Sequence, residues 1–207
     1  MRYVGPKNRI SRREGTDLGL KTPGSKSHAR LLKRLNILPG QHGAKGRRRK
    51  VSEHASQLRE KQKMRYMFGV SEKQLKRYFQ KSVRKKGNTA FFLSQRLEAR
   101  LDNIVFRLGF SPTRASARQL VGHGHIKVND RVVTIPSYQV KVNDIISFSS
   151  ESPTKIGYVE KSLMNKDMVL PKWLERKASV GKLISEPTAE EIEKQITLRS
   201  IIEYYSR

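Results

Sequence analysis

The 207-residue chain has no cysteine, few aromatic residues and no long apolar run. Without cysteine it can form no disulfide bond. No window approaches the roughly 18 consecutive apolar residues that a membrane helix needs, which excludes an integral membrane protein. The first residues also lack the apolar stretch of a secretory signal. We therefore expect an intracellular protein, and the length predicts one large or two small domains.

Acidic residues are the other scarce class. The chain has 18 Asp and Glu against 44 Lys and Arg, a formal net charge of +26. Residues 1–50 hold 15 basic and 2 acidic residues and residues 51–100 hold 13 and 4, whereas residues 151–207 hold 10 and 9. Like charge concentrated in this way calls for a polyanion, either nucleic acid or an anionic membrane. Gly-Pro and Pro-Gly pairs interrupt the first 50 residues and disfavour a continuous amphipathic membrane helix, so nucleic acid is the preferred partner.

Glycine, proline and serine predict that residues 1–50 form a largely irregular arm with one short helix near residues 26–36, and its basic charge makes it a candidate for nucleic-acid binding. Residues 51–95 are predicted to begin a helical domain. Ser52 is placed to cap a helix that runs to Met67. In the next helix, Ser71 and Gln74 form a capping box.

Residues 187–207 are predicted to complete the helical domain. Thr188 with Glu191 forms a further capping box, and four apolar residues follow at helical spacing, namely Leu198, Ile201, Ile202 and Tyr205. This apolar stripe needs a partner, and the helices of residues 52–87 are the simplest one. The helical domain would then be discontinuous in sequence.

Residues 96–186 are predicted to be an inserted module with a less certain segment at its end. One long helix, or two in series, ends at Gly109, and Ser111-Pro112 starts the next helix with serine as its N-cap. The apolar period then falls from 3.6 to two, and Asn129-Asp130 marks a turn between strands. The pattern assigns no secondary structure to residues 149–187. The predicted fold class is α+β: a basic N-terminal arm, a helical domain completed by the C-terminal helix, and a small inserted helix-helix-β-sheet module.

The sequence gives little support for catalysis or metal binding. The chain has no phosphate-cradling glycine loop and no nucleophile elbow. His123-Gly124-His125 could chelate a metal, but no cysteine and no nearby carboxylate pair completes the site. We therefore expect no catalytic residue, no metal and no cofactor, and we predict that the chain is not an enzyme.

One stretch of the sequence indicates a protein family far more specifically than the features above. The run from Arg100-Leu-Asp-Asn103 through Ser111-Pro-Thr-Arg114 to His123-Gly-His-Ile-Lys-Val-Asn129 resembles the RNA-binding module named after the small-subunit ribosomal protein S-four. That module also occurs in pseudouridine synthases, tyrosyl-tRNA synthetases and a heat-shock ribosome-associated protein. By itself it therefore implies RNA binding and not the ribosome.

Further motifs extend the resemblance to the ribosomal S-four family over nearly the whole chain. They are Gly5-Pro6, Arg12-Arg13-Glu14-Gly15, Pro39-Gly40-Gln41-His42-Gly43, Gln57-Leu58-Arg59-Glu60-Lys61-Gln62-Lys63 and Ile202-Glu203-Tyr204-Tyr205-Ser206. Some members carry zinc-binding cysteines around the positions of Asn8 and Ser11, so this chain resembles the cysteine-free, zinc-free form of the bacterial or organellar type. It also has Asn129-Asp130 where the family usually has an Asn-Gly turn.

The resemblance implies a structural constituent of the small ribosomal subunit. Such a protein binds a multi-helix junction in the 5′ region of small-subunit ribosomal RNA, nucleates assembly, lies near the mRNA entry channel, contacts ribosomal protein S-five and influences translational accuracy. Some members repress translation of their own mRNA. The location implied is the cytoplasmic ribosome of a bacterium, or the ribosome of a plastid or the mitochondrial matrix. No membrane and no small-molecule substrate are implied.

Two alternatives remain open. An RNA-modifying enzyme or a ribosome-associated factor could use the same module, although residues 150–207 are short for a catalytic domain. A DNA-binding protein would place a helix in the major groove, whereas the basic residues here are spread over an arm and several helices.

RNA junctions are recognised mostly through shape and phosphates, and the planar arginine fork suits such recognition. Residues 111–114 would also open a helix whose free N–H groups favour a phosphate. The candidate RNA-binding residues are Arg2, Lys7, Arg9, Arg12, Arg13, His42, Lys45, Arg47, Arg48, Arg49 and Lys50 in the arm, Lys61, Lys63, Arg65 and Arg77 in the helical domain, and Arg100, Ser111, Thr113, Arg114, Arg118, Gln119, His123, Lys127, Asn129 and Arg131 in the module.

Overall fold

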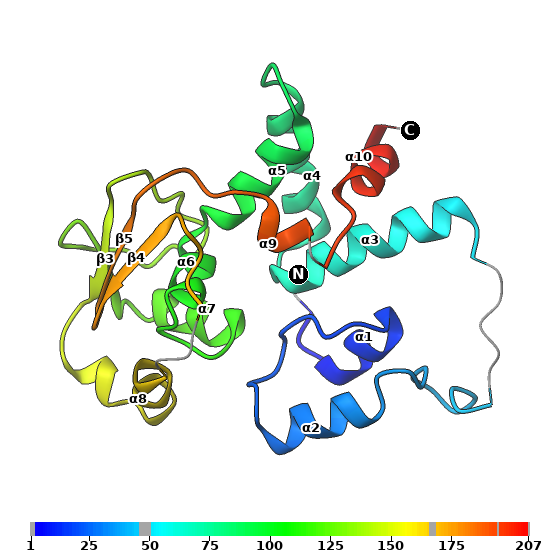
Figure 1. Ribbon diagram of the computed structural model, residues 1–207, viewed down its shortest axis with the longest axis horizontal. Coiled ribbons are helices and arrows are strands. Elements are labelled where there is room, and N and C mark those ends of the chain that lie inside the picture. The colour runs from blue at the N-terminus through cyan, green and yellow to red at the C-terminus, as the bar shows by residue number, and fades with distance from the viewer. Residues whose placement is uncertain (1–2, 46–50, 166–168, 194, 207) are drawn as a thin grey trace. The chain divides into compact units, whose positions relative to one another are not determined.

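The computed structural model describes residues 3–45, 51–165, 169–193 and 195–206. The chain divides into two compact units, each described by itself below and coloured by residue number in Figure 1. The helical unit comprises Met1–Phe92 with Ile192–Arg207, and the sheet unit comprises Leu93–Glu191. Within the described residues, no helix has the length and apolar character needed to cross a bilayer.

The helical unit begins with two short helices, α1 (Lys7–Glu14) and α2 (Lys26–Lys33). The helix predicted near residues 26–36 is confirmed as α2. The prediction that the rest of the arm is irregular is wrong for α1. Periodicity could not reveal α1, because Ile10 is its only apolar side chain and is buried. Its end was nevertheless marked, since Gly15 follows it with a left-handed backbone (φ 69°).

The next two helices, α3 (Glu53–Met67) and α4 (Glu72–Val83), begin where their capping residues predict. The hydroxyl of Ser52 accepts the N–H of Ala55, and both hydrogen bonds of the Ser71–Gln74 capping box are present. These bonds satisfy N–H groups that a helix start leaves without partners. Both predictions are confirmed.

The single C-terminal helix predicted from Thr188 is wrong, because the structure has α9 (Glu190–Glu193) and a separate α10 (Leu198–Ser206). At the start of α10 the N–H of Thr197 donates to Glu60 Oε2 on α3 (2.8 Å) instead of to a helical carbonyl. The predicted packing of the C-terminal helix is confirmed: α10 lies against α3 and α4. Tyr205 stacks on Phe79 with ring centroids 4.9 Å apart.

The sequence left open whether one long helix or two helices in series end at Gly109. The structure has two, α5 (Thr89–Glu98) and α6 (Leu101–Arg107). The extended backbone of Arg100 separates them. The first N–H groups of α6, from Leu101 and Asp102, donate to the carbonyls of Tyr138 and Pro136 (2.9 and 3.2 Å). Gly109 ends α6 with a left-handed backbone, as predicted.

The following helix, α7 (Arg114–Gly122), starts later than predicted. Thr113 and not Ser111 is the N-cap, since the Thr113 hydroxyl accepts the N–H of Ser116. Ser111 is buried and its hydroxyl bonds to the Thr113 carbonyl and the Ser116 hydroxyl. Ser111-Pro112 therefore belongs to the turn before the helix.

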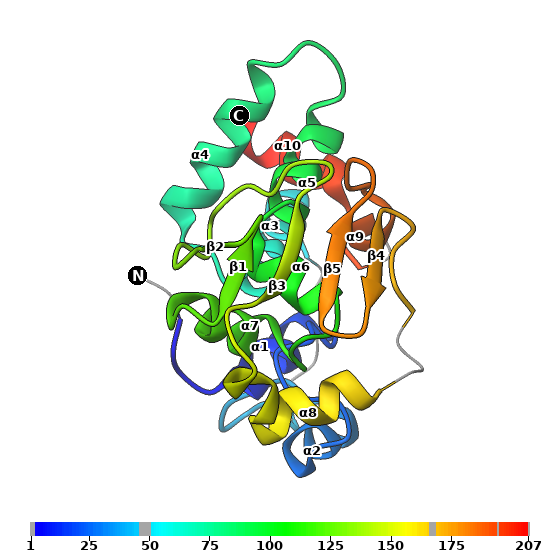
Figure 2. The same ribbon diagram turned by 90° about the vertical axis from the view of Figure 1, so that its left-hand side faces the viewer.

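One five-stranded antiparallel sheet completes the sheet unit, with the order β2-β1-β3-β5-β4 (Figure 2). Its strands are β1 (Ile126–Val128), β2 (Arg131–Val132), β3 (Ile145–Phe148), β4 (Leu174–Lys177) and β5 (Val180–Leu183). The predicted turn between β1 and β2 is confirmed, with positive φ at Asn129 (48°) and Asp130 (64°). The segment without a sequence assignment forms the 3-10 turn η1 (Ser152–Lys155), α8 (Gly157–Met164) and the β4–β5 hairpin.

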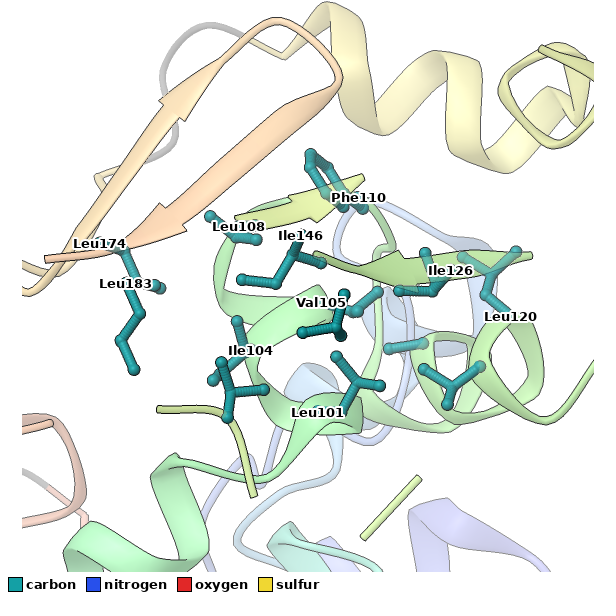
Figure 3. Packing of buried hydrophobic residues seen from close by; sticks show 14 of the residues in the cluster. Leu101, Ile104, Val105, Leu108, Phe110, Leu120, Ile126, Ile146, Leu174 and Leu183 are labelled. Atoms are coloured by element: carbon teal, nitrogen blue, oxygen red, sulfur yellow. The ribbon is translucent and has the colours of Figure 1, made fainter. Parts of the chain in front are cut away.

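The core of the sheet unit lies between α6, α7 and one face of the sheet (Figure 3). Leu101, Ile104, Val105 and Leu108 line one side of α6 and are fully buried. They pack with Leu120 from α7 and with strand residues such as Ile126 and Ile146. The α+β fold class is confirmed. This core fixes the opposite sides of α6 and α7, where the charged residues gather.

Candidate RNA-binding surface

Two buried carboxylates organise the charged side of α6 and α7 in the sheet unit. Glu98, the last residue of α5, is 0% exposed, and Asp102, in the first turn of α6, is 4% exposed. Buried carboxylates are costly unless they are paired and hydrogen-bonded. Three arginines and one asparagine supply those partners, and a fourth arginine, Arg114, joins through the asparagine.

Asp102 binds two arginines. Its Oδ1 accepts Nε of Arg100 (3.0 Å) and its Oδ2 accepts Nη2 of Arg100 (2.7 Å), a bidentate pair. The same Oδ2 accepts Nη1 of Arg118 on α7 (3.1 Å). The Arg100 side chain is fully buried, whereas that of Arg118 is 31% exposed.

Glu98 is the second carboxylate of the network. It accepts two hydrogen bonds from Arg107 (2.7 and 3.1 Å) and one from the amide of Asn103 (2.5 Å). The amide oxygen of Asn103 in turn accepts Nε of Arg114 (2.8 Å), whose guanidinium lies 4.5 Å from the centre of the Phe106 ring. Burial, together with the nearby charge of Arg107, lowers the pKa of Arg114 to about 10.

The network therefore holds two arginine side chains of α7, Arg114 and Arg118, against α6. Four guanidinium groups face two carboxylates, so the network keeps an excess of positive charge. Arg114 and Arg118 are one helical turn apart on α7, and Gln119 beside them is exposed. Fixed, planar and cationic groups of this kind are suited to phosphate recognition.

Three residues predicted to contact RNA in this unit are not at the surface, and their role is corrected. Arg100 (0% exposed) neutralises Asp102, and Ser111 and Thr113 (2% and 8%) form the turn and cap before α7. The cap occupies the Ser116 N–H that a phosphate would otherwise bind. All three residues are buried and support the candidate RNA-binding surface through these contacts.

Other predicted contacts lie at the end of α7 and along β1 and β2. His123 and Arg131 are exposed and Lys127 is half-buried. Asn129 is exposed, but its amide donates to Asp144 Oδ1 (2.8 Å) and accepts the N–H of Ile145 (2.9 Å). Its geometry is that of a turn residue that ties the hairpin to β3.

The helical unit carries exposed cations on several elements. The exposed predicted contacts are Arg9, Arg13, His42, Lys45 and Arg77, and Lys7 is half-buried. Arg12 has a different role: its guanidinium donates to the carbonyls of Ile37 and Leu38 (2.9 and 3.0 Å) and so fixes the chain after α2 against α1.

Three predicted contacts on α3 are engaged within the helical unit. Lys61 is only 4% exposed, and its ammonium pairs with Glu72 (2.9 Å) and lies 4.5 Å from the centre of the Tyr204 ring. The prediction that Lys61 contacts RNA is thereby corrected, since this lysine joins α3, α4 and α10. Lys63 is paired with Glu60 (2.7 Å), and Arg65 is stacked over Tyr66.

Comparison with known proteins identifies the family. The family described as "Ribosomal protein S4/S9 N-terminal domain" matches residues 2–98, and the "S4 domain" matches residues 99–146. The small ribosomal subunit protein uS4 of Chromobacterium violaceum is 43% identical over 208 residues, which cover 100% of this chain and 99% of the relative. Those of Caldicellulosiruptor bescii and Chloroflexus aurantiacus are 45% and 43% identical with the same coverage. The chain belongs to the uS4 family of small ribosomal subunit proteins. The resemblance noted in the sequence is confirmed.

The two uS4 family matches meet at the arginine network. Glu98 ends the first match, and Asp102 and all four arginines of the network lie in the second. The S4-domain match stops at Ile146, within β3, so the β4–β5 hairpin lies outside it. The candidate surface therefore belongs to the part that this chain shares with other S4 domains.

Five predicted contacts, Arg2, Arg47, Arg48, Arg49 and Lys50, lie outside the described residues. Sequence reasoning in turn missed Glu98, Asp102, Asn103 and Arg107 as members of the network. A signal existed in α7, because Arg114 and Arg118 are four residues apart and so lie on the same side of that helix. That spacing becomes informative only once α6 and α7 are known to pack together.

Proposed function

We propose that this uS4-family chain is a structural constituent of the small ribosomal subunit that binds its ribosomal RNA. The observation that carries the proposal is the network of arginines fixed on α6 and α7 within the residues that match the S4 domain. The net charge of the first 100 residues supports it, since they hold 28 basic and 6 acidic residues. The action is binding and not catalysis.

The RNA target we propose is a multi-helix junction in the 5′ region of small-subunit ribosomal RNA, whose binding nucleates assembly. Shape and phosphate positions identify such a junction without base-edge pairing along a helix. The domain division predicted from the sequence suits this kind of recognition. Residues 1–50 and the first helices neutralise phosphates, and the nearly neutral module recognises shape.

The partners and location follow from the family. We propose contact with ribosomal protein S-five, a place near the mRNA entry channel and an influence on decoding accuracy. The three relatives named above are bacterial, which supports a bacterial cytoplasmic ribosome over an organellar one.

Fractionation with crosslinking tests the proposal. The protein is expected to co-sediment with small ribosomal subunits and to crosslink to one junction in the 5′ region of their RNA. Sedimentation apart from small subunits, or crosslinks scattered over unrelated RNA, would contradict it.

Replacing Arg114 and Arg118 together with alanine is expected to weaken junction binding by roughly 2–4 kcal/mol, since both are charge-assisted contacts. The measurement is a binding isotherm with the junction RNA. Lys155→Ala with Lys177→Ala is the control, because it removes the same charge from two exposed lysines of the same unit. Equal weakening by the two double variants would show that only net charge matters.

A further inference from the structure

Asp102 places a negative charge on the side of α6 that faces the arginines of the candidate surface. A carboxylate near bound phosphates repels them, and burying it costs free energy. Net charge alone would therefore favour a neutral residue at this position. The contacts of Asp102 suggest what the carboxylate contributes instead.

The three side chains form a series from the interior outward. Arg100 is 0% exposed, Asp102 is 6% exposed and Arg118 is 31% exposed, all measured on the side chain. Arg100 holds the carboxylate through two hydrogen bonds, so the carboxylate is fixed before it meets Arg118. Its Oδ2 then accepts Nη1 of Arg118 at 3.1 Å.

We propose that Asp102 is a positioning residue for RNA binding, which holds the guanidinium of Arg118 in one orientation on α7. The inference rests on the proposed function, that this face binds ribosomal RNA. A free arginine side chain loses rotamer freedom when it binds a phosphate, whereas one already held loses less. Asp102 thus strengthens RNA binding although its own charge opposes it.

The two effects of Asp102 have opposite signs, and Asp130 provides the matched control. Asp130 lies in the exposed β1–β2 turn of the same unit. Asp102→Asn and Asp130→Asn each raise the net charge by one. Charge alone predicts that both variants bind RNA slightly more tightly. Positioning predicts that Asp102→Asn binds a junction transcript about tenfold more weakly, while Asp130→Asn binds as well as the parent or better.

A double-mutant cycle separates positioning from a general loss of structure. If Asp102 acts through Arg118, Asp102→Asn has little further effect on RNA binding in an Arg118→Ala background. If it acts only by supporting the fold, it weakens binding equally in both backgrounds, and the inference fails. Circular dichroism and thermal unfolding establish that each variant is folded at the binding temperature.

A second variant keeps the test decisive if Asp102→Asn does not fold because Arg100 loses its partner. Arg118→Lys retains the charge and loses the planar fork, so it is expected to weaken junction binding several-fold. Parental affinity in Arg118→Lys would overturn the inference.

Different results would contradict the proposed function and the positioning role of Asp102. A parent protein that binds a plain RNA duplex as tightly as the junction transcript contradicts the proposed function. A parent that discriminates between these RNAs, with Asp102→Asn and Asp130→Asn binding alike, contradicts only the role of Asp102.

Discussion

At the scale of single residues, the partner of an arginine decides its role. Arg12 and Arg176 donate to backbone carbonyls and tie chain segments together. Arg114 and Arg118 are held by side chains of α6 and keep part of their surface exposed. A basic chain of this kind uses some of its cations to build the structure that presents the others.

Arg176→Met is expected to destabilise the protein by about 2–3 kcal/mol, because the guanidinium of Arg176 serves three carbonyls. It donates to Ala178 (3.1 Å), to Leu108 at the end of α6 (3.1 Å) and to Leu163 in the last turn of α8 (2.8 Å). Urea unfolding measures the loss. Lys177→Met is the control on the same strand, since Lys177 is 85% exposed and its pair with Glu175 contributes little. Equal stability of the two variants would contradict this role.

Glu14→Gln is expected to stabilise the protein at neutral pH. The Glu14 side chain is only 4% exposed and lies 3.8 Å from Arg59. Burial raises the pKa of Glu14 above its ordinary value of 4.5, against the opposing effect of Arg59. The folded state therefore binds a proton at Glu14 more readily than the unfolded state does. Protonated Glu14 contributes stability below about pH 4.5, and this contribution is lost as the pH rises through the pKa of Glu14 in the folded state.

The advantage of Glu14→Gln should therefore be clear at about pH 7 and vanish at about pH 4. Chemical unfolding at both pH values measures it, with the exposed Glu160→Gln as control. A larger advantage at the acidic pH would reverse the sign and refute the argument.

At the scale of helices and strands, the sequence predicts those features that nearby residues determine. The caps at Ser52 and Ser71, the end of α6 at Gly109 and the Asn129-Asp130 turn each depend on contacts within a few residues. Just before α10 the N–H of Thr197 bonds to Glu60, far away in sequence, a contact that local periodicity does not predict. The β4–β5 hairpin likewise becomes a pair of strands by joining β3.

The same limit applies to the candidate surface. Sequence reasoning proposed Arg114, Arg118 and the exposed cations of the arm as RNA contacts from charge and family resemblance. It could not distinguish them from Arg100 and Lys61, because burial of those two depends on partners that only the fold supplies. Residue type thus predicts a basic surface, while packing decides which cations belong to it.

Gly181→Ala tests how closely β5 packs on α6. An added Cβ at this buried glycine would lie 2.6 Å from Leu108 Cδ2, too close for a carbon contact. We expect a loss of about 1–3 kcal/mol in the free energy of unfolding. Gly157→Ala is the control, because its Cβ would meet open space in α8, where alanine favours the helix. Adding Leu108→Ala should cost less in the Gly181→Ala background than alone, and strict additivity would contradict the clash.

At the scale of the whole molecule, the net charge is concentrated in the first half of the chain, whereas we expect specificity for RNA to come from the second half. Residues 1–100 carry 28 basic and 6 acidic residues, whereas residues 101–150, which include α6 and α7, carry 6 and 3. Most phosphate neutralisation is therefore expected from the first half. The arginine network contributes geometry more than net charge.

The salt dependence of RNA binding should reflect this division. If about ten phosphates are neutralised, the logarithm of the affinity falls with the logarithm of salt concentration at a slope of roughly −7 to −9. Removing two cations from the arm should reduce that slope for junction and duplex RNA alike, as Arg9→Ala with Arg13→Ala would test. A slope near zero in the parent protein would refute the electrostatic account.

The split of the helical unit between Met1–Phe92 and Ile192–Arg207 sets an order of events during synthesis. The continuous sheet unit leaves the ribosome before α10 does, so it can fold first as a separate domain. Phe79 and Glu72 can form their contacts with Tyr205 only after Tyr205 has been synthesised, more than a hundred residues later. Until α10 is made, Phe79 of α4 and the polar residues Gln57 and Lys61 of α3 lack the partners that α10 supplies. Completion of the helical unit is thus timed by the translation of α10.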